Sequence, residues 1–274
     1  MAPKFFLGFF IWVLSIHPDV SHASNTEVTI AKQEVTSSPL SDTPSKEGER
    51  PNPVSFMQTL GDKVLNTTKT KQGRERKQAL RKIFEAHIHH KSIAQFVLGK
   101  ARNFLRAALK EVENEEEKKK LKKEIEDLLE IFYETYKESI IRIYLTSFNE
   151  DYKKMTFRAS SVTEDGPDGV IVHSTLDRHN GADPITLDWV LKFFSPKGET
   201  QKRWHIVDVR VMEVSQATKE RDETSAVFGQ YRNECMQNMG KRCAVYALKH
   251  LIEKHRALNT SYESSFPQSG TVGA

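Results

Sequence analysis

The chain has 274 residues and a net charge of +4, from 41 basic and 37 acidic side chains. This length suits one or two domains. The positive charge is spread along the sequence without a clustered Lys/Arg face, which excludes a typical nucleic-acid-binding protein and leaves a weak, unspecific attraction to anionic membranes.

The first residues have the pattern of a secretory signal peptide. Lys4 precedes an apolar run from Phe5 to Ile16, and small residues follow around Ala23. The run is shorter than the roughly 20 residues that a membrane-spanning helix needs. We therefore expect residues 1–23 to be a signal peptide and the mature protein to work outside the cytosol.

Composition divides the rest of the chain into three parts. Residues 24–53 are rich in Ser, Thr, Pro and Glu and contain few large apolar side chains, so we expect a disordered leader. The patterns of a folded domain fill residues 54–257. Residues 258–274 are polar and are expected to form a flexible tail.

The two cysteines, Cys235 and Cys243, leave a disulfide undecided. On one continuous helix their Cα atoms would lie about 12 Å apart, too far for a disulfide. Gly240 lies between them and can end a helix, in which case the chain doubles back and a bridge becomes feasible.

Apolar side chains recur at helical spacing at both ends of the domain. Ser55 is a candidate N-cap for the first helix. We expect helices that begin at Val54, after Gly73 and at Ser92, and helices from Lys110 to about Asn149, from Glu220 to Met239 and from Ala244 to His255.

The segments between these helices alternate between apolar and polar residues, as strands do. Ile185, Leu187, Trp189, Leu191 and Phe193 take every second position. We expect four strands, over residues 156–162, 170–176, 185–193 and 204–211. Helices followed by consecutive strands and then by helices predict an α+β fold, with an antiparallel sheet of about four strands and the helices packed on one side.

Several short motifs stand as landmarks along the domain. They are Phe56-Met57-Gln58, Leu60 to Leu65, Ile93 to Lys100 with Arg102, Tyr144, Trp204 with Asp208-Val209, and Val214-Ser215. Together they resemble the MlaC-like family, the toluene-tolerance proteins that are auxiliary components of ABC transporters. The resemblance extends from about Val54 to Leu251, and the segment Ile93–Arg102 is its most specific part. Gln95, Ala101 and Glu213 depart from the residues common in the family.

This resemblance implies a periplasmic phospholipid carrier and not an enzyme. It implies a curved sheet that encloses an apolar pocket with the helices, and no cofactor other than the phospholipid carried as cargo. The implied partners are an outer-membrane lipoprotein–porin complex and an inner-membrane lipid ABC transporter, which together maintain outer-membrane lipid asymmetry. Another apolar cargo, such as a hopanoid, is an alternative, and no nucleic-acid partner is expected.

Strand alternation and helix spacing select the side chains that would line such a pocket. The alternative is that they form an ordinary core, which is the commoner role of apolar residues at these periods. The selected residues are Phe96, Val97, Phe104, Ile140, Tyr144, Val170, Val172, Trp189, Leu191, Phe193 and Ile206.

Asp208 lies in an otherwise apolar strand and matches a Trp-x-x-x-Asp pattern of the family. A buried carboxylate needs a partner. We therefore expect an ion pair with Arg102 or Arg142, which would have a structural role.

The sequence contains candidates for two other kinds of site, a metal site and an enzyme active site. His87, His89 and His90 lack a nearby Cys or acidic ligand at a recognised spacing, so no metal site is expected. An enzyme with a cone-shaped cavity would recruit histidines from the strands together with Asp208. The candidates are His173 and His205, but His205 and Asp208 are three positions apart and on a regular strand would point to opposite faces.

Overall fold

The computed structural model describes residues 50–147, 153–179, 181, 183–239 and 242–264. The expected signal peptide and nearly all of the expected leader lie outside these residues. The described helices and strands belong to one unit of the chain, Pro51–Ala274. The helices are α2 (Pro53–Thr70), α3 (Gly73–His87), α4 (His90–Lys110), α5 (Glu115–Ser147), α6 (Gln216–Met239) and α7 (Cys243–Ser264). The strands are β1 (Thr156–Glu164), β2 (Gly169–Asp177), β3 (Ile185–Phe194), β4 (Arg203–Val211) and β5 (Val214–Ser215).

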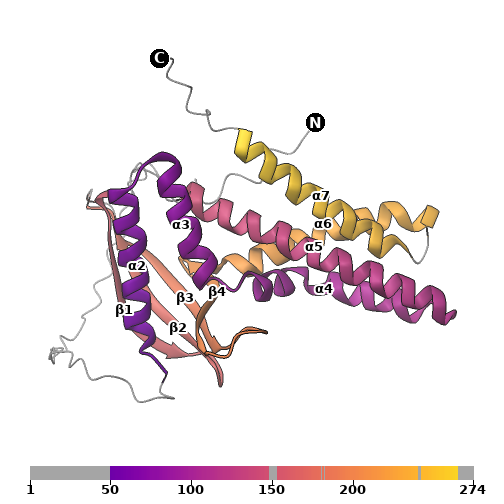
Figure 1. Ribbon diagram of the computed structural model, residues 1–274, viewed down its shortest axis with the longest axis horizontal. Helices are drawn as coiled ribbons and strands as arrows, with labels where there is room; N and C mark the ends of the chain where they lie inside the picture. The colour runs from indigo at the N-terminus through magenta and orange to yellow at the C-terminus, as the bar shows by residue number, and fades with distance from the viewer. Residues whose placement is uncertain (1–49, 148–152, 180, 182, 240–241, 265–274) are drawn as a thin grey trace, which may run out of the picture. The chain divides into compact units, whose positions relative to one another are not determined.

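The strands form one antiparallel sheet in the order β1-β2-β3-β4-β5 (Figure 1). Each strand pairs with the next along the chain, because hairpin connections suffice to join antiparallel neighbours. The predicted α+β class is confirmed. The sheet has one strand more than predicted, because two-residue β5 is too short to show an alternating pattern.

A tight turn between β4 and β5 has an unusual backbone. Met212 and Glu213 both have positive φ, at 49° and 69°. A two-residue hairpin turn needs this left-handed geometry to match the twist of its strands, and glycine or asparagine usually supplies it. Glu213, one of the residues that depart from the resembling family, therefore adopts strained backbone angles. A bond from the Met212 amide to the Thr186 carbonyl, at 3.2 Å, holds the turn against β3.

The starts of two helices follow from capping side chains. The Asn52 Oδ1 atom accepts bonds from the amides of Val54 and Ser55, at 2.9 and 3.1 Å. Pro53 fills the first helical position, where its missing N–H is not needed. The N-cap of α2 is therefore Asn52 and not Ser55, so that expectation was wrong. Asn114 caps α5 in the same way, accepting from the Glu117 amide at 3.0 Å.

Helix α4 contains a break at Gly99, within the segment that most resembles the family. Gly99 has φ 39° and ψ −115°, far from helical values. A Cβ atom there would lie 3.0 Å from the Cγ of Arg221 on α6. The Arg221 guanidinium lies over the Phe96 ring, 4.9 Å from its centroid. Glycine thus permits both the backbone angles of the break and the close approach of α6.

Two groups of helices accompany the sheet (Figure 1). Helix α2 lies along β1 and β2, and α3 packs on α2. Helices α4, α5, α7 and α6 pack as a four-helix group in which each contacts the next and α6 returns to α4. Helices α4 and α5 run antiparallel, as do α6 and α7, whereas α4 runs parallel to α6 and α5 parallel to α7. Each helix buries its apolar stripe against its neighbours in the group.

The link between α3 and α4 is attached to the outer edge of β4. Ile88 forms a parallel bridge with Ile206, and the His89 amide donates to the Ile206 carbonyl at 2.9 Å. The His89 ring packs edge-on against Phe194 and His205, with centroids 4.8 and 5.4 Å away. This link therefore joins the sheet to the point where the four-helix group begins.

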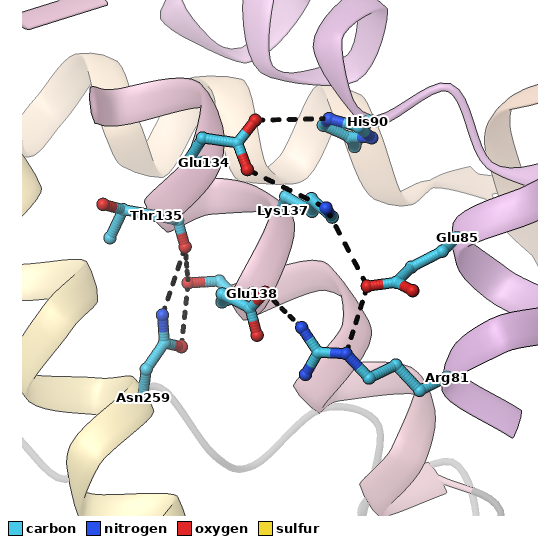
Figure 2. A network of polar contacts seen from close by, with 9 residues as sticks. Arg81, Glu85, His90, Glu134, Thr135, Lys137, Glu138 and Asn259 are labelled. Carbon is cyan, nitrogen blue, oxygen red and sulfur yellow. Dashed lines mark hydrogen bonds and ion pairs between the residues drawn. The ribbon is translucent and has the colours of Figure 1, made fainter. Parts of the chain in front are cut away.

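A network of charged side chains connects α3 and α4 to α5 (Figure 2). Arg81 pairs with Glu138 and, at 3.1 Å, with Glu85. Lys137 lies 3.8 Å from both Glu85 and Glu134. Because the carboxylates are shared between cations, ordering one side chain helps to order the next, which makes a network more effective than isolated surface pairs.

Candidate functional site

Strand register gathers the predicted pocket residues of the sheet on one face. Val170 pairs with Leu191, and Val172 pairs with Trp189. Leu191 also pairs with Ile206 on β4. Paired residues point to the same side of a sheet. The apolar sheet face, as we name it, therefore includes Val170, Val172, Trp189, Leu191, Phe193 and Ile206.

Helix α2 covers the β1 end of the apolar sheet face. The Gln58 side chain donates to the Phe157 carbonyl at 3.2 Å and accepts from the Ala159 amide at 2.8 Å. A Cβ atom at Gly61 would lie 2.2 Å from the Phe157 ring. Only glycine permits this contact, which lets the helix lie directly on the aromatic ring of β1.

Burial differs across this face. Val172 and Leu191 are fully buried, whereas Trp189 and Phe193 are half-buried. Val162, which pairs with Val172 from β1, is 43% exposed. The face thus combines a packed centre with apolar side chains that keep accessible surface, which is the kind of surface that binds hydrocarbon.

Trp189 and Trp204, which pairs with Phe193 and so lies on the same face, have fixed orientations. The Trp189 indole N–H donates to the Ser174 hydroxyl at 2.9 Å, and that hydroxyl donates to the Leu187 carbonyl at 3.0 Å. The Trp204 indole N–H donates to the Pro51 carbonyl at 2.7 Å. Because the polar atom of each indole is satisfied, the ring remains available for apolar contacts.

The predicted residues on the helices fall into different environments. Val97 and Ile140 are buried, and Tyr144 packs on Phe84 of α3 with ring centroids 5.1 Å apart. Burial raises the pKa of the Tyr144 phenol, which stays neutral.

Phe96 and Phe104 face α6. Phe104 stacks on Phe228 at 6.2 Å, with the Arg232 guanidinium 4.2 Å from its ring centroid. Phe96 is 44% exposed beneath Arg221. The structure therefore brings the strand residues together and places these two phenylalanines in a separate contact between α4 and α6.

Asp208 has partners other than the predicted arginines. Its carboxylate accepts from the Ser215 hydroxyl at 2.6 Å and from the Ala217 amide at 2.9 Å. Ser215 in turn accepts from the Thr218 amide at 3.0 Å, as an N-cap of α6 does. Neither Arg102 nor Arg142, both within the described residues, forms an ion pair with this carboxylate. The expected ion pair is replaced by a link between β4 and the positive end of the α6 dipole.

A β-bulge in β4 changes which residues share a face. Leu191 pairs with Ile206, but Val190 pairs with Asp208, so Val207 is left without a counterpart on β3. As a result His205 and Asp208 lie on the same face, opposite to the apolar sheet face, and the expectation of opposite faces was wrong.

His205 is poorly suited to acid–base chemistry. Burial, together with the neighbouring His89 and Arg203, lowers its pKa to about 4. A base of such low pKa is weak near neutrality. Its Nε2 atom is buried and has no hydrogen-bond partner among the described residues.

The other candidate histidine, His173, belongs to a cross-strand array on that opposite face. Its Nδ1 atom lies 2.8 Å from an Asp188 carboxylate oxygen, and its Nε2 atom 3.2 Å from the Thr163 hydroxyl. The three residues come from adjacent strands, where pairs of opposite polarity stabilise a sheet. This role accounts for the arrangement without catalysis.

The histidines near the α3–α4 link are engaged in local contacts. The His87 Nδ1 atom lies 2.7 Å from the Ile83 carbonyl, and the His89 Nδ1 atom 2.7 Å from the Ser92 hydroxyl. Burial lowers the pKa of His87, His89 and His90. Within the described part of the chain, no group of three or more His, Cys, Asp or Glu residues could hold a metal ion.

Cys235 and Cys243 are joined by a disulfide, with Cα atoms 5.3 Å apart. Helix α6 ends at Met239 and α7 begins at Cys243, so the chain reverses between the two cysteines. The bridge fastens the α6–α7 end of the four-helix group.

A groove of about 410 Å³ lies between α5 and α7. Its lining is mainly charged, so it does not suit an acyl chain. The lining residues are Lys120, Lys123, Glu124, Asp127, Leu128 and Lys249.

Three residues that shape the apolar sheet face were not assigned a role from the sequence. Gln58 and Gly61 fix α2 on β1, and Ser174 fixes Trp189. Gln58 and Gly61 lie within the landmarks of the resemblance. Ser174 is a polar residue at an inward position of a strand, and such a residue indicates that a buried polar group nearby, here the Trp189 indole N–H, needs a partner.

No helix among the described residues has the length and apolar character required to span a bilayer.

Comparisons with known proteins agree with this architecture. The fold resembles the phospholipid-binding protein from Ralstonia solanacearum, which was solved in complex with a phospholipid. The TM-score is 0.53 at 15% identity, and the match covers 77% of this chain and 99% of that one. No curated protein sequence matches the chain significantly. The model of the MlaC protein family matches residues 58–234, from α2 to α6, and the chain therefore belongs to the MlaC family.

Proposed function

We propose that this protein is a periplasmic carrier that binds phospholipid acyl chains on the apolar sheet face. The observation that carries the proposal is the register that brings Val172, Trp189 and Leu191 onto one face, whose β1 end α2 covers. Membership of the MlaC family and a fold shared with a protein that holds a phospholipid support it.

The energetics of such a cargo require transfer between docked partners. A two-chain phospholipid has about 30 methylenes, and burying each contributes about 0.8 kcal/mol, so the gross stabilisation exceeds about 20 kcal/mol. Release of this cargo into water is negligible. We infer that loading and unloading take place within complexes, with an outer-membrane lipoprotein–porin assembly and an inner-membrane lipid ABC transporter, and that this transfer maintains outer-membrane lipid asymmetry.

A carrier of this kind needs shape and apolar surface, with no reacting group. The features of this chain that resemble a catalytic site, His173 with Asp188 and Thr163, lie on the face opposite to Trp189 and Leu191. The proposed role is therefore binding without catalysis, and with phospholipid as cargo in place of a cofactor.

Native mass spectrometry of the purified protein, followed by solvent extraction, tests the proposal. We expect a stoichiometric phospholipid; a hopanoid in the extract would keep the carrier role and change the cargo. The variants Val172→Trp and, at a half-buried position on the same face, Leu187→Trp should lower the amount of bound lipid because the added ring occupies its space.

Thr186→Trp is the matched control, since Thr186 is exposed and points to the opposite face. Circular dichroism identifies which variants are folded. Unchanged lipid content in folded Val172→Trp and Leu187→Trp proteins would contradict the assignment of the apolar sheet face as the binding site.

A further inference from the structure

Positive charge is concentrated where α2 ends and α3 begins. The unit Pro51–Ala274 contains 37 basic and 31 acidic side chains, a net charge of +6. Residues 69–82 contain seven basic side chains and one acidic one, so this short segment alone accounts for that net charge. The even spread inferred from the sequence does not hold for the folded unit. The basic residues of this segment, which we call the basic turn, are Lys69, Lys71, Arg74, Arg76, Lys77, Arg81 and Lys82.

Two of these cations are neutralised within the fold. Lys71 pairs with Glu75, and Arg81 belongs to the network with Glu85 and Glu138 (Figure 2).

Three others face solvent. Lys69, Arg74 and Lys82 are exposed, and within the described residues none of them has an ion-pair partner. The basic turn therefore presents uncompensated charge.

Folding stability does not explain this placement. The first turn of a helix favours acidic side chains because the helix dipole is positive there. Helix α3 instead begins with Arg74 and Arg76 on either side of Glu75, followed by Lys77, and its N-cap residue Gln72 makes no capping bond. Burial and the neighbouring Arg76 lower the pKa of Lys77, so the cations also disfavour one another. A cluster that opposes local stability is suited to a partner that brings negative charge.

We propose that the basic turn docks the protein on the anionic phospholipid surface of a bilayer. Each Lys or Arg near such a surface contributes about 1 kcal/mol. Protein interfaces usually contain exposed aromatic or aliphatic anchors at their centre. The large hydrophobic side chains that are exposed in the described chain, such as Phe96 and Met212, all lie outside residues 69–82. Charge without an apolar anchor matches a layer of lipid headgroups better than it matches a protein surface.

The position of the basic turn makes this contact useful. It follows directly on α2, which covers the β1 end of the apolar sheet face, so docking places α2 close to the headgroups. The inference goes beyond the proposed function, because vesicle binding through the basic turn holds whether or not the protein carries lipid.

Co-sedimentation of the purified protein with vesicles tests this surface. We expect binding to phosphatidylcholine vesicles that contain phosphatidylglycerol, and no binding to phosphatidylcholine alone. Binding should be lost when salt rises from about 0.1 M to about 1 M, because the Debye length falls from about 10 Å to about 3 Å. The triple variant Lys69→Glu, Arg74→Glu, Lys82→Glu should bind at least about a hundredfold more weakly.

A matched control separates the surface from the total charge. Lys192→Glu, Lys197→Glu, Lys202→Glu changes the net charge equally at exposed positions on β3 and the β3–β4 turn, and should bind as the unaltered protein does. Equal losses in both triple variants, or equal binding to both kinds of vesicle, would overturn the proposal.

Binding to soluble polyglutamate without binding to anionic vesicles would also overturn it, in favour of an acidic protein partner. Lipid extraction from the basic-turn variant should show unchanged cargo, so a failure of this inference is distinguishable from a failure of the proposed function.

Discussion

Asp208 is the single residue that ties the sheet to the start of α6. Its carboxylate accepts from the Ser215 hydroxyl and the Ala217 amide, and Ser215 caps the helix. Asp208 and Ser215 thereby satisfy the Ala217 and Thr218 amides, which lie in the first turn of α6 and have no partner within the helix. One side chain thus sets the direction in which α6 leaves β4.

We predict that Asp208→Asn lowers the free energy of unfolding by about 1–2 kcal/mol, because the amide loses one acceptor and the charge that complements the dipole. Urea denaturation measures this change. Ser215→Ala and the double variant complete a cycle, and the two single effects should not add, since both remove the same link. Exposed Asp183 provides the control Asp183→Asn, and additive effects at positions 208 and 215 would contradict the link.

The sequence correctly marked Asp208 as a polar residue that needs a partner, but it could not identify that partner. The choice between an arginine and a helix end depends on where α6 begins in space. The bulge at Val207 was missed although the sequence carries a signal of it: the apolar residues stand at even positions in Trp204 and Ile206 and at odd positions in Val209 and Val211. Asn52 was overlooked as an N-cap because Ser55 is equally suitable by residue type.

At the scale of helices, the contact between α5 and α7 contains a buried titratable group. His255 on α7 lies edge-on between Phe132 and Tyr136 of α5, at 5.9 and 5.4 Å. Its Nδ1 atom lies 3.1 Å from the Ser139 hydroxyl. Burial, followed by the nearby charges of Lys254 and Arg142, lowers the pKa of His255 to about 4. The imidazole is therefore packed as a neutral aromatic ring.

We predict that acid weakens this contact. An unfolded histidine has a pKa of about 6.5, so below that pH the unfolded chain binds a proton that the folded one does not. The contribution of neutral His255 to the free energy of unfolding is complete above about pH 6.5 and falls as the pH approaches 4. From pH 7.5 to pH 5 the loss attributable to His255 is about 2 kcal/mol.

His255→Gln keeps a hydrogen-bonding group and does not titrate, so the fall in the urea midpoint between these pH values should be smaller in the variant. The matched control is His179→Gln, the same substitution at an exposed position, measured at the same two pH values. An unchanged slope in His255→Gln would contradict a neutral, buried role for this ring.

The strands were predictable because each is long enough to show alternation, and β2, β3 and β4 begin and end within a residue or two of the expected positions. Only β5 was missed, since its pairing with β4 is set by the turn at Met212 and Glu213 and by no pattern of its own. The sequence could place Phe96 and Phe104 on an apolar helix face, but periodicity does not say which neighbour a helix face meets.

At the scale of the whole unit, the disulfide closes the end of the four-helix group where α6 and α7 meet. In the chain-entropy model, closing a loop as short as Cys235–Cys243 stabilises the fold by roughly 2–3 kcal/mol. We predict that the double variant Cys235→Ala, Cys243→Ala loses this amount in urea denaturation. The unaltered protein under reducing conditions should lose the same amount, and a variant as stable as the oxidised protein would contradict a stabilising bridge.

The composition of the proposed binding face was predictable at this scale, and its surroundings were not. Alternation selected Val172, Trp189 and Leu191 because strand period alone decides which side chains share a face. The position of α2 on β1 depends on the contact between Gly61 and Phe157, which are distant in sequence. A single sequence contains no direct signal of that pairing.

The edges of the sheet limit how copies of the molecule can associate through their backbones. The outer side of β4 is occupied by the Ile88–His89 link and by β5, so within the described chain β1 is the one long strand whose outer edge pairs with no other strand. The Gln58 side chain occupies part of that edge, at the Phe157 carbonyl and the Ala159 amide. Polymerisation by strand pairing needs two unpaired strand edges on every subunit, because each subunit must pair with one neighbour on either side. A molecule with one unpaired edge can pair through it with a single second copy. Both edges are then used, so this sheet permits a dimer and does not support growth into a fibril.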